Sequence, residues 1–188
     1  RSRGSRLWTC PSRSRPLLHR LLEKNNMTID DVDFVEMAPP DMPAALARGD
    51  IKAYIVAEPF GSESIIAGHG KKLVDAREIW PDYICCVLVA NPDFAKKHRE
   101  ALNSLAEAIV EAGIYIDNHQ DEVIKIAGEY FKINEKTWHQ SFEWGVEYSE
   151  LSIKKDELKD LETEMEKRGL LKESINVEEV LKAEEESF

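Results

Sequence analysis

Short apolar runs alternate with apolar residues at helical spacing over the first half of the chain, up to about Ala90. The leucines at 17, 18, 21 and 22 lie on one face of a predicted helix that ends near Asn25-Asn26. Apolar runs that predict short strands lie at 33–37, 53–57 and 72–74. Strands and helices that alternate in this way predict βαβ units around a parallel sheet.

The segments between these strands carry start and stop signals for helices. Asp41 is suited to cap a helix that ends at Gly49, because glycine adopts the left-handed turn after a helix. The run at 53–57 is expected to be a buried strand. It is followed by Glu58-Pro59-Phe60 and by a helix that is predicted to end near Ala67.

The most apolar run in the chain is residues 84–90, which predict a fully buried strand because the run is short and bounded by prolines. Cys85 and Cys86 are expected to pack in the core on opposite faces of that strand, so they would not chelate a metal together. After residue 91 the pattern is helical, with helices expected at 92–113, 121–131, 135–144 and 156–168. The first of these is capped by Asn91, and its apolar stripe includes Phe94, Leu102, Leu105, Ile109 and Val110.

Charge is distributed unevenly along the 188 residues. Residues 1–20 carry six arginines and no acidic residue, which gives them a charge of +6 and leaves −17 for the rest of a chain whose net charge is −11. Such an acidic body repels phosphate backbones, so nucleic acid is not an expected partner. Residues 1–16 are an atypical Arg/Ser-rich segment, and no apolar stretch of the secretory-signal type follows their basic residues. No apolar run approaches the roughly 18 residues that a membrane-spanning helix needs.

The sequence lacks the short motifs that accompany common catalytic sites, namely the dinucleotide-binding glycine pattern, the phosphate loop and the nucleophile elbow. Its five histidines are scattered, and none has a second histidine one helical turn away. They are therefore interpreted as surface or capping residues instead of metal ligands. We expect no catalytic residue, no metal and no cofactor.

Candidate binding residues lie where the predicted strands end. In open parallel sheets, ligands bind beyond the carboxyl ends of the strands, where helix N-termini present N–H groups. Three such corners precede predicted helices, and their candidate residues are Ser12, Arg13 and Ser14; Pro40, Asp41 and Met42; and Glu58, Pro59 and Phe60. The Glu58 carboxylate is suited to bind a ligand amine, a cation or a neighbouring amide.

The order of the last two corners resembles the second lobe of ABC-transporter solute-binding proteins of the nitrate/sulfonate/taurine/bicarbonate group, which also includes thiamine-pyrimidine binders. The residues that carry the resemblance are Ala44-Ala45-Leu46, then Gly49, then Glu58-Pro59 with the aromatic Phe60. It extends over about residues 17–175, including Ile79–Val89 and Asn91–Gly113. Lys52 stands where the family usually has Asp, and residues 6–11 are a poor match to the strand that the family has before the first helix.

This resemblance implies an α/β fold of the type II periplasmic-binding-protein class, with one parallel-sheet lobe followed by a C-terminal helical segment. Residues 17–82 would form the second lobe, and residues 83–188 would supply a return strand and helices that pack on a first lobe that is largely missing here. The implied function is to bind a small polar ligand by hinge closure and to deliver it to the membrane subunits of an ABC permease. The implied location is periplasmic or on the cell surface, and no signal is present in this chain.

The ligand class stays open among a sulfonate, a nitrate- or bicarbonate-type oxyanion and a thiamine-pyrimidine precursor. Because Glu58 would repel a bare anion, an amine-bearing pyrimidine or an oxyanion with a metal suits that residue better. One alternative is an enzyme on the same scaffold, of the thiamine-pyrimidine synthase or menaquinone-pathway type. Another is a self-associating fragment without transport activity. This fragment would form a homodimer, because residues 83–112 would otherwise expose a large apolar patch.

Overall fold

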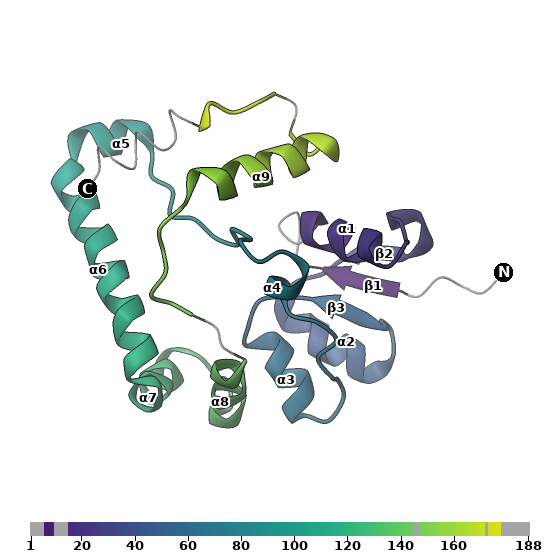
Figure 1. Ribbon diagram of the computed structural model, residues 1–188. Coiled ribbons are helices and arrows are strands. Elements are labelled where there is room, and N and C mark those ends of the chain that lie inside the picture. The colour runs from purple at the N-terminus through teal and green to yellow at the C-terminus, as the bar shows by residue number, and fades with distance from the viewer. Residues whose placement is uncertain (1–5, 10–14, 145–146, 172, 178–188) are drawn as a thin grey trace. The chain divides into compact units, whose positions relative to one another are not determined.

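The computed structural model describes residues 6–9, 15–144, 147–171 and 173–177 (Figure 1). The chain divides into two compact units. The first comprises Arg1–Pro81 and Ile124–Val146, and the second comprises Asp82–Val123 and Glu147–Phe188. The β-sheet lies in the first unit, whereas the described regular elements of the second unit are helices.

Strands alternate with helices in the first part of the chain, and helices follow. In chain order the elements are β1 (Arg6–Thr9), α1 (Arg15–Lys24), the 3₁₀ helix η1 (Ile29–Asp31), β2 (Asp33–Glu36), the 3₁₀ helix η2 (Pro39–Asp41), α2 (Met42–Arg48), β3 (Ala53–Ile55), α3 (Phe60–Ile66), α4 (Ala76–Ile79), α5 (Pro92–Lys97), α6 (Arg99–Asn118), α7 (Gln120–Tyr130), α8 (Glu135–Glu143) and α9 (Lys155–Lys167). The strands predicted at 33–37 and 53–57 are confirmed as β2 and β3. The helices predicted around them are confirmed as α1, α2 and α3, and those predicted for the last third as α7, α8 and α9.

The sheet is parallel throughout, with strand order β2-β1-β3. β1 is therefore its central strand, and Thr9 lies opposite Glu36 on one side and Ile55 on the other. The expectation that residues 6–11 make a poor strand is wrong for residues 6–9. Backbone pairing on both sides of a short segment outweighs an unfavourable local pattern, because β-propensity depends strongly on tertiary context.

The core of the first unit is built from one face each of α1, α2 and α4. Its buried apolar residues include Leu17, Leu18, Leu22, Met42, Ala45, Ile51, Ile79 and Trp80. The Arg20 guanidinium lies 3.4 Å from the centroid of the Trp80 ring, and Lys24 Nζ donates a 2.8 Å hydrogen bond to the Glu78 carbonyl. These contacts fix α1 against α4. β3 is half-buried, which corrects the expectation of a buried strand, because β3 is an edge strand of the described sheet.

α8 packs on α3 within the first unit. The sequence pattern does not anticipate this contact, because the resemblance assigns all helices after residue 91 to another lobe. The boundary at residue 83 stays a prediction, and the structure adds that residues 124–146 cluster with the sheet-bearing unit.

The start of the helical segment in the second unit follows the predicted capping. The Asn91 side chain accepts hydrogen bonds from the backbone N–H groups of Asp93 (2.9 Å) and Phe94 (3.2 Å). The single helix predicted over 92–113 is instead two helices, α5 and α6, because His98 adopts a non-helical backbone conformation between them. The predicted apolar stripe is largely exposed here, with Phe94, Leu105, Ile109 and Val110 between 37% and 48% accessible.

The C-terminal part of α6 holds the segment that begins at residue 147. The Asp117 carboxylate accepts hydrogen bonds from the backbone N–H groups of Tyr148 (3.1 Å) and Ser149 (2.8 Å). One helical turn earlier, Gly113 is buried, and a Cβ atom there would collide with the Tyr148 carbonyl oxygen. The Asp117 carboxylate therefore binds this segment through hydrogen bonds, and the lack of a side chain at Gly113 allows the segment to approach α6 closely.

Residues 84–90 form no strand in the structure, which contradicts the prediction of a fully buried strand. A strand needs a partner backbone, and none of the three strands among the described residues pairs with this run. Val89 is accordingly 81% exposed, and Cys85 and Cys86 are exposed instead of packed in a core. The apolar run at 72–74 also forms no strand.

Candidate functional site at the carboxyl edge of the sheet

The carboxyl ends of the three strands meet at one edge of the sheet. β1, β2 and β3 are parallel and in register, so their last residues, Thr9, Glu36 and Ile55, are neighbours. The three predicted corners follow these strand ends in the sequence. Ser12, Arg13 and Ser14 lie outside the described residues. The other two corners, at 40–42 and 58–60, are brought to the same edge by the sheet.

The corner after β2 is a short 3₁₀ helix that leads directly into α2. Pro40 and Asp41 are exposed in it, and the Asp41 side chain makes no capping hydrogen bond to α2. Met42 is fully buried in the core, so packing is the role that its position supports. Asp41 is therefore the residue that presents an exposed polar side chain at this corner.

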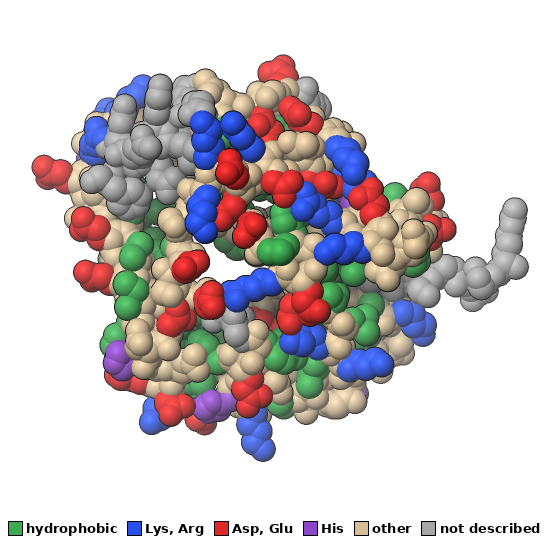
Figure 2. Space-filling view, viewed as in Figure 1, with side chains coloured by type: hydrophobic (Ala, Val, Ile, Leu, Met, Phe, Trp, Pro, Cys, Tyr) green, Lys and Arg blue, Asp and Glu red, His purple; other side chains and the backbone are tan. Residues whose placement is uncertain are grey.

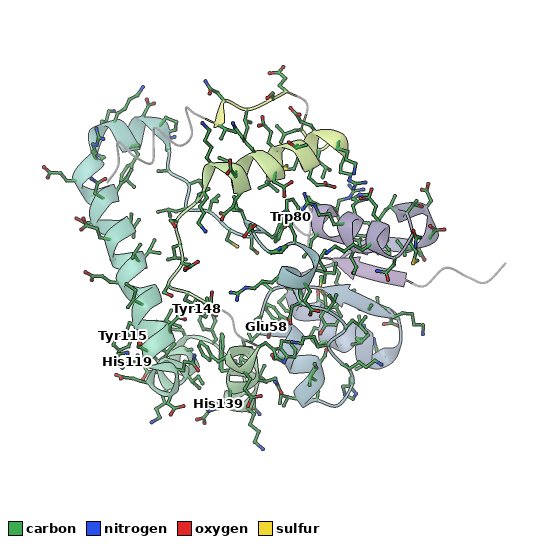
Figure 3. The ribbon with its side chains drawn as sticks, in the orientation of Figure 1. Glu58, Trp80, Tyr115, His119, His139 and Tyr148 are labelled. Carbon is green, nitrogen blue, oxygen red and sulfur yellow. The ribbon has the colours of Figure 1, made fainter. Side chains whose placement is uncertain are left out.

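The corner after β3 is organised around the Glu58 carboxylate (Figure 3). Glu58 Oε2 accepts a 2.8 Å hydrogen bond from Ser141 Oγ on α8 and a 3.2 Å hydrogen bond from the backbone N–H of Ser62 on α3. Pro59 is buried and Phe60 is half-buried. Of the three roles expected for Glu58, the geometry shows the one with a neighbouring amide, and it adds a hydroxyl group that the sequence pattern did not reveal.

Gly61 makes this arrangement compact. A Cβ atom at Gly61 would lie 2.6 Å from Glu58 Oε1 and 3.4 Å from a ring carbon of Trp144. The Lys72 ammonium group also lies 4.9 Å from the centroid of the Trp144 ring. The start of α3 thus approaches the end of α8 closely, with the carboxylate between them.

Tyr54 on β3 also forms hydrogen bonds with the corner at residues 58–60 and with α3. Tyr54 Oη is hydrogen-bonded to the Phe60 carbonyl oxygen (2.9 Å) and to Ser64 Oγ (2.5 Å). Burial raises the pKa of the Tyr54 phenol, its hydrogen bond with Ser64 lowers it in part, and the nearby Glu58 and Glu63 charges raise it further. The net pKa lies above the ordinary value, so this phenol stays neutral and fixes the first turn of α3.

Arg15 is a residue of this edge that the sequence pattern did not single out. It is the first residue of α1, the helix that follows β1 in the sequence. Its guanidinium carbon lies 5.4 Å from the centroid of the Phe34 ring, and its buried Nε–H has no hydrogen-bond acceptor among the described residues. In the sequence, the only feature that could have identified Arg15 as a site residue is its position directly after the predicted corner at residues 12–14.

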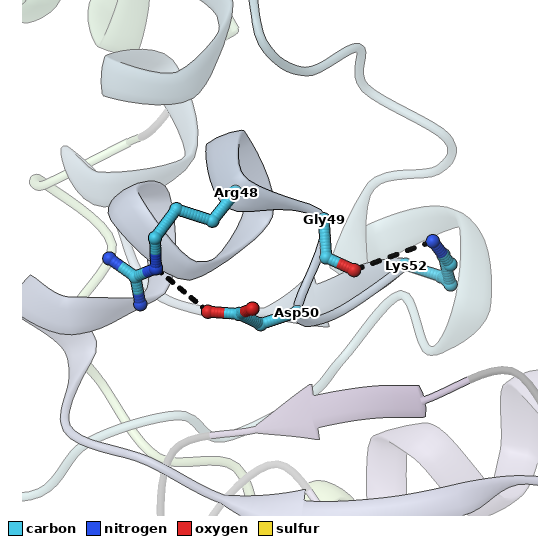
Figure 4. Close-up of polar contacts among 4 residues, drawn as sticks. All are labelled: Arg48, Gly49, Asp50 and Lys52. Atoms are coloured by element: carbon cyan, nitrogen blue, oxygen red, sulfur yellow. Dashed lines mark hydrogen bonds and ion pairs between the residues drawn. The ribbon is translucent and has the colours of Figure 1, made fainter.

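The turn between α2 and β3 contains the position where this chain departs from the pattern of the family it resembles. Arg48 Nε donates a 2.8 Å hydrogen bond to Asp50 Oδ2, and Lys52 Nζ lies 3.4 Å from the Gly49 carbonyl oxygen (Figure 4). Gly49 has a φ of 77°, as its predicted position after α2 requires. Lys52 is exposed, so this departure from the family pattern lies on the surface of the turn.

Histidines and acidic residues form no metal centre among the residues that the structure describes, because no three of the His, Cys, Asp and Glu side chains converge there. His119 stacks on the Tyr115 ring one turn earlier in α6, and His139 lies 3.8 Å from Glu135 on α8 (Figure 3).

Acidic and basic side chains are interspersed over the face seen in Figure 2. Among the described helices, none has the length and apolar content needed to cross a membrane.

Relatives of this chain are found among components of anion and sulfonate import systems. The chain is 25% identical over 135 residues to the nitrate/nitrite binding protein NrtA of Synechococcus elongatus, a match that covers 69% of this chain and 30% of NrtA. It is 32% identical over 83 residues to the taurine-binding periplasmic protein of Escherichia coli, covering 43% and 25% of the two chains. It is 32% identical over 110 residues to the bicarbonate transport ATP-binding protein CmpC of Synechocystis, covering 57% of this chain and 16% of CmpC. The chain therefore spans less than a third of each of these relatives.

Solved structures show the same fold. The ligand-binding component of an ABC-type import system from Staphylococcus aureus, solved with zinc bound, aligns with a TM-score of 0.80 and 27% identity over 90% of this chain and 59% of its own. The periplasmic aliphatic sulphonate binding protein SsuA of Escherichia coli aligns with a TM-score of 0.77 and 14% identity, over 93% and 57%. The predicted periplasmic-binding-protein-like α/β fold is thus confirmed for the part of the fold that this chain spans.

Membership of a family rests on the sequence match itself. The model of the NMT1-like family matches residues 11–128, which is more than half of the chain. This segment contains β2, β3 and the corners at 40–42 and 58–60. It confirms the resemblance to the nitrate/sulfonate/taurine group that the corners indicated. The chain belongs to the NMT1-like family.

Proposed function

We propose that this chain is part of the solute-binding component of an ABC importer. The observation that carries the proposal is the family match over residues 11–128, together with relatives named for binding nitrate or nitrite and taurine. The chain spans about three fifths of the solved binding components that it matches. The partners of the whole protein would be a small polar ligand and the membrane subunits of a permease, at the periplasmic face or cell surface.

The ligand site in this proposal is the carboxyl edge of the sheet, next to β1. From β1 the chain continues to β2 on one side of β1, and it then crosses to β3 on the other side. The carboxyl ends of β1 and β3 therefore flank the topological switch point, which is where ligands bind in open parallel sheets. The segments that follow these two strands contain Ser12–Ser14 and Glu58–Phe60. The corner at Pro40–Met42, after β2, would form the adjoining wall.

An anionic group is the part of the ligand that this edge is best suited to hold. The Glu58 carboxylate is engaged with Ser62 and Ser141, so it is not a bare charge directed at a ligand. Arg15 and Arg13 bring positive charge to the segment after β1, and the buried Arg15 Nε–H lacks an acceptor among the described residues. A small sulfonate or a nitrate- or bicarbonate-type oxyanion is therefore the proposed ligand, ahead of a thiamine-pyrimidine precursor.

Binding would act through closure of two lobes around the ligand. A ligand that contacts both lobes only in the closed state shifts the population toward that state by its differential affinity. No bond is made or broken in such a cycle. The relatives named above are binding and transport components, which favours this function over an enzyme on the same scaffold. The ATP-binding function in the name of CmpC is not carried over, because this sequence has no phosphate loop.

Ligand-induced stabilisation tests the proposal. Unfolding of the purified chain is followed by scanning fluorimetry with taurine, a short alkanesulfonate, nitrate or bicarbonate, at equal ionic strength set with chloride. A ligand present at 100 times its Kd should stabilise the folded state by about 2.7 kcal/mol and raise the Tm by several degrees. Equal Tm values with all four anions and with chloride would count against an anion site in this chain.

A further inference from the structure

Glu58 keeps one oxygen of its carboxylate free for a further hydrogen-bond donor. The bonds from Ser141 Oγ and from the Ser62 backbone N–H both end on Oε2. Among the described residues, no donor reaches Oε1 and no basic side chain forms an ion pair with Glu58. The Lys72 ammonium group is bound to Asp75 Oδ2 at 2.8 Å. Glu58 therefore presents a negative charge that is fixed in place and has unused acceptor capacity.

Arg15 presents the opposite charge at the same edge of the sheet. It begins α1, which follows β1, and β1 pairs directly with β3, the strand that precedes Glu58. Its guanidinium group lies against the Phe34 ring and forms no ion pair with a described carboxylate. The first turn of α1 contains no acidic residue, and a cation is unfavourable at a helix N-terminus. The positive charge of Arg15 is therefore not compensated within its own helix.

The two charges are held apart by different partners. Glu58 is fixed by α3 and α8, whereas Arg15 lies against β2. We infer that the ligand of this edge is a zwitterion, a small sulfonate that also carries an ammonium group. The sulfonate lies on the Arg15 side, and the ammonium group donates a hydrogen bond to Glu58 Oε1. This inference rests on the proposed function, because it divides the same site into an anionic and a cationic subsite.

An ammonium group on the ligand removes the conflict between an anion and the Glu58 carboxylate. A sulfonate without an amine would meet the positive charge of Arg15 and be repelled by Glu58. A sulfonate with an ammonium group instead gains a hydrogen bond between two charged groups, which is stronger than a neutral one. The site should therefore bind the zwitterion about 10- to 100-fold more tightly than the same sulfonate without the amine.

The experiment is isothermal titration of the full chain with taurine and with ethanesulfonate, which differ only by the amine, at pH 7 and equal ionic strength. The wild type should bind taurine at least tenfold more tightly. Glu58→Gln keeps a side-chain oxygen for Ser62 and Ser141, and it should reduce the ratio of the two Kd values to about twofold or less. Glu63→Gln removes the same charge from an exposed position on α3 and should keep the ratio of the wild type. Circular dichroism checks that both variants keep the fold.

The outcomes separate this inference from the proposed function. Equal affinities of the wild type for taurine and ethanesulfonate, or an unchanged ratio in Glu58→Gln, would overturn the zwitterion and leave an anion-binding protein. Binding of nitrate or bicarbonate without binding of either sulfonate would do the same. A chain that binds none of these four ligands would overturn the inference together with the proposed function.

Discussion

The Ser141 hydroxyl group donates a 2.8 Å hydrogen bond to the Glu58 carboxylate across 83 positions of the sequence. Glu58 lies in the segment between β3 and α3, and Ser141 lies on α8, so this bond joins the candidate binding corner to a helix from the last third of the chain. Glu58 also accepts the backbone N–H of Ser62, which fixes the start of α3. The carboxylate at this corner is thus held by the protein on two sides.

Removal of the Ser141 hydroxyl group should weaken the packing of α8 on α3. Ser141 is buried, and its loss would leave Glu58 with one hydrogen bond fewer, so Ser141→Ala is expected to lower the free energy of unfolding by about 1–2 kcal/mol. Urea denaturation followed by circular dichroism measures this. Ser152→Ala, at an exposed serine, is the matched control and should change stability by less than about 0.5 kcal/mol. Equal stabilities of the two variants would show that the bond does not contribute.

Two glycines in helices should respond oppositely to alanine. Gly113→Ala would push a methyl group into the Tyr148 carbonyl oxygen, and overpacking of this kind costs about 1–3 kcal/mol. Gly128 in α7 has open space around its Cβ position, so Gly128→Ala should stabilise the protein by about 0.5–1 kcal/mol through helix propensity. Thermal unfolding of both variants tests the pair. A stabilising Gly113→Ala substitution would contradict the close approach of residue 148 to α6.

Asp117 should make part of the stability depend on acid pH. Partial desolvation opposes ionisation of its carboxyl group, but hydrogen bonds from Ser149 and from the backbone N–H groups of Tyr148 and Ser149 outweigh it and lower the pKa. A lowered folded-state pKa gives stability that is present above the ordinary value of 3.8 and is lost as the pH falls through the folded-state pKa below it. Asp117→Asn should therefore have a lower Tm than the wild type at pH 6, and the difference should shrink toward pH 2.5. Glu129→Gln, at an exposed carboxylate, is the control, and a pH-independent difference for Asp117→Asn would contradict this account.

Arg15 should contribute to anion binding if the edge next to β1 is the ligand site. A charge-assisted hydrogen bond to an anion contributes about 1.5–3 kcal/mol, so Arg15→Gln should weaken binding of the active anion by about 10- to 100-fold. Arg99→Gln removes the same charge from an exposed position on α6 and should leave the Kd within about twofold. Isothermal titration measures both. Equal losses in the two variants would indicate an effect of net charge alone.

The sequence pattern was sufficient for the parts of this fold that depend on local signals. Asn91 as a helix cap, Gly49 as a helix stop and the strands β2 and β3 all follow from residue types at fixed spacing. The candidate corners at 40–42 and 58–60 follow from the same rules, and the parallel register brings them to one edge.

The features that were missed depend on partners distant in the sequence. β1 becomes a strand because β2 and β3 pair with it, whereas residues 84–90 have a stronger strand pattern and no pairing strand among the described residues. The Ser141–Glu58 bond and the buried Met42 side chain likewise follow from tertiary packing, which residue spacing does not encode. Strand geometry predicted that the Cys85 and Cys86 side chains point to opposite faces. This prediction is wrong, because the segment forms no strand and the two sulfur atoms are in contact.

Native mass spectrometry of the protein purified from its natural source shows whether it binds a small solute. Spectra are recorded as isolated and after addition of taurine, an alkanesulfonate, nitrate or bicarbonate at equal ionic strength. A solute-binding protein should carry a single small-molecule adduct with the mass of a sulfonate or oxyanion, or should acquire such an adduct with one of these anions. A protein that carries no small molecule and acquires none of the four at millimolar concentration would contradict the proposed role in solute binding.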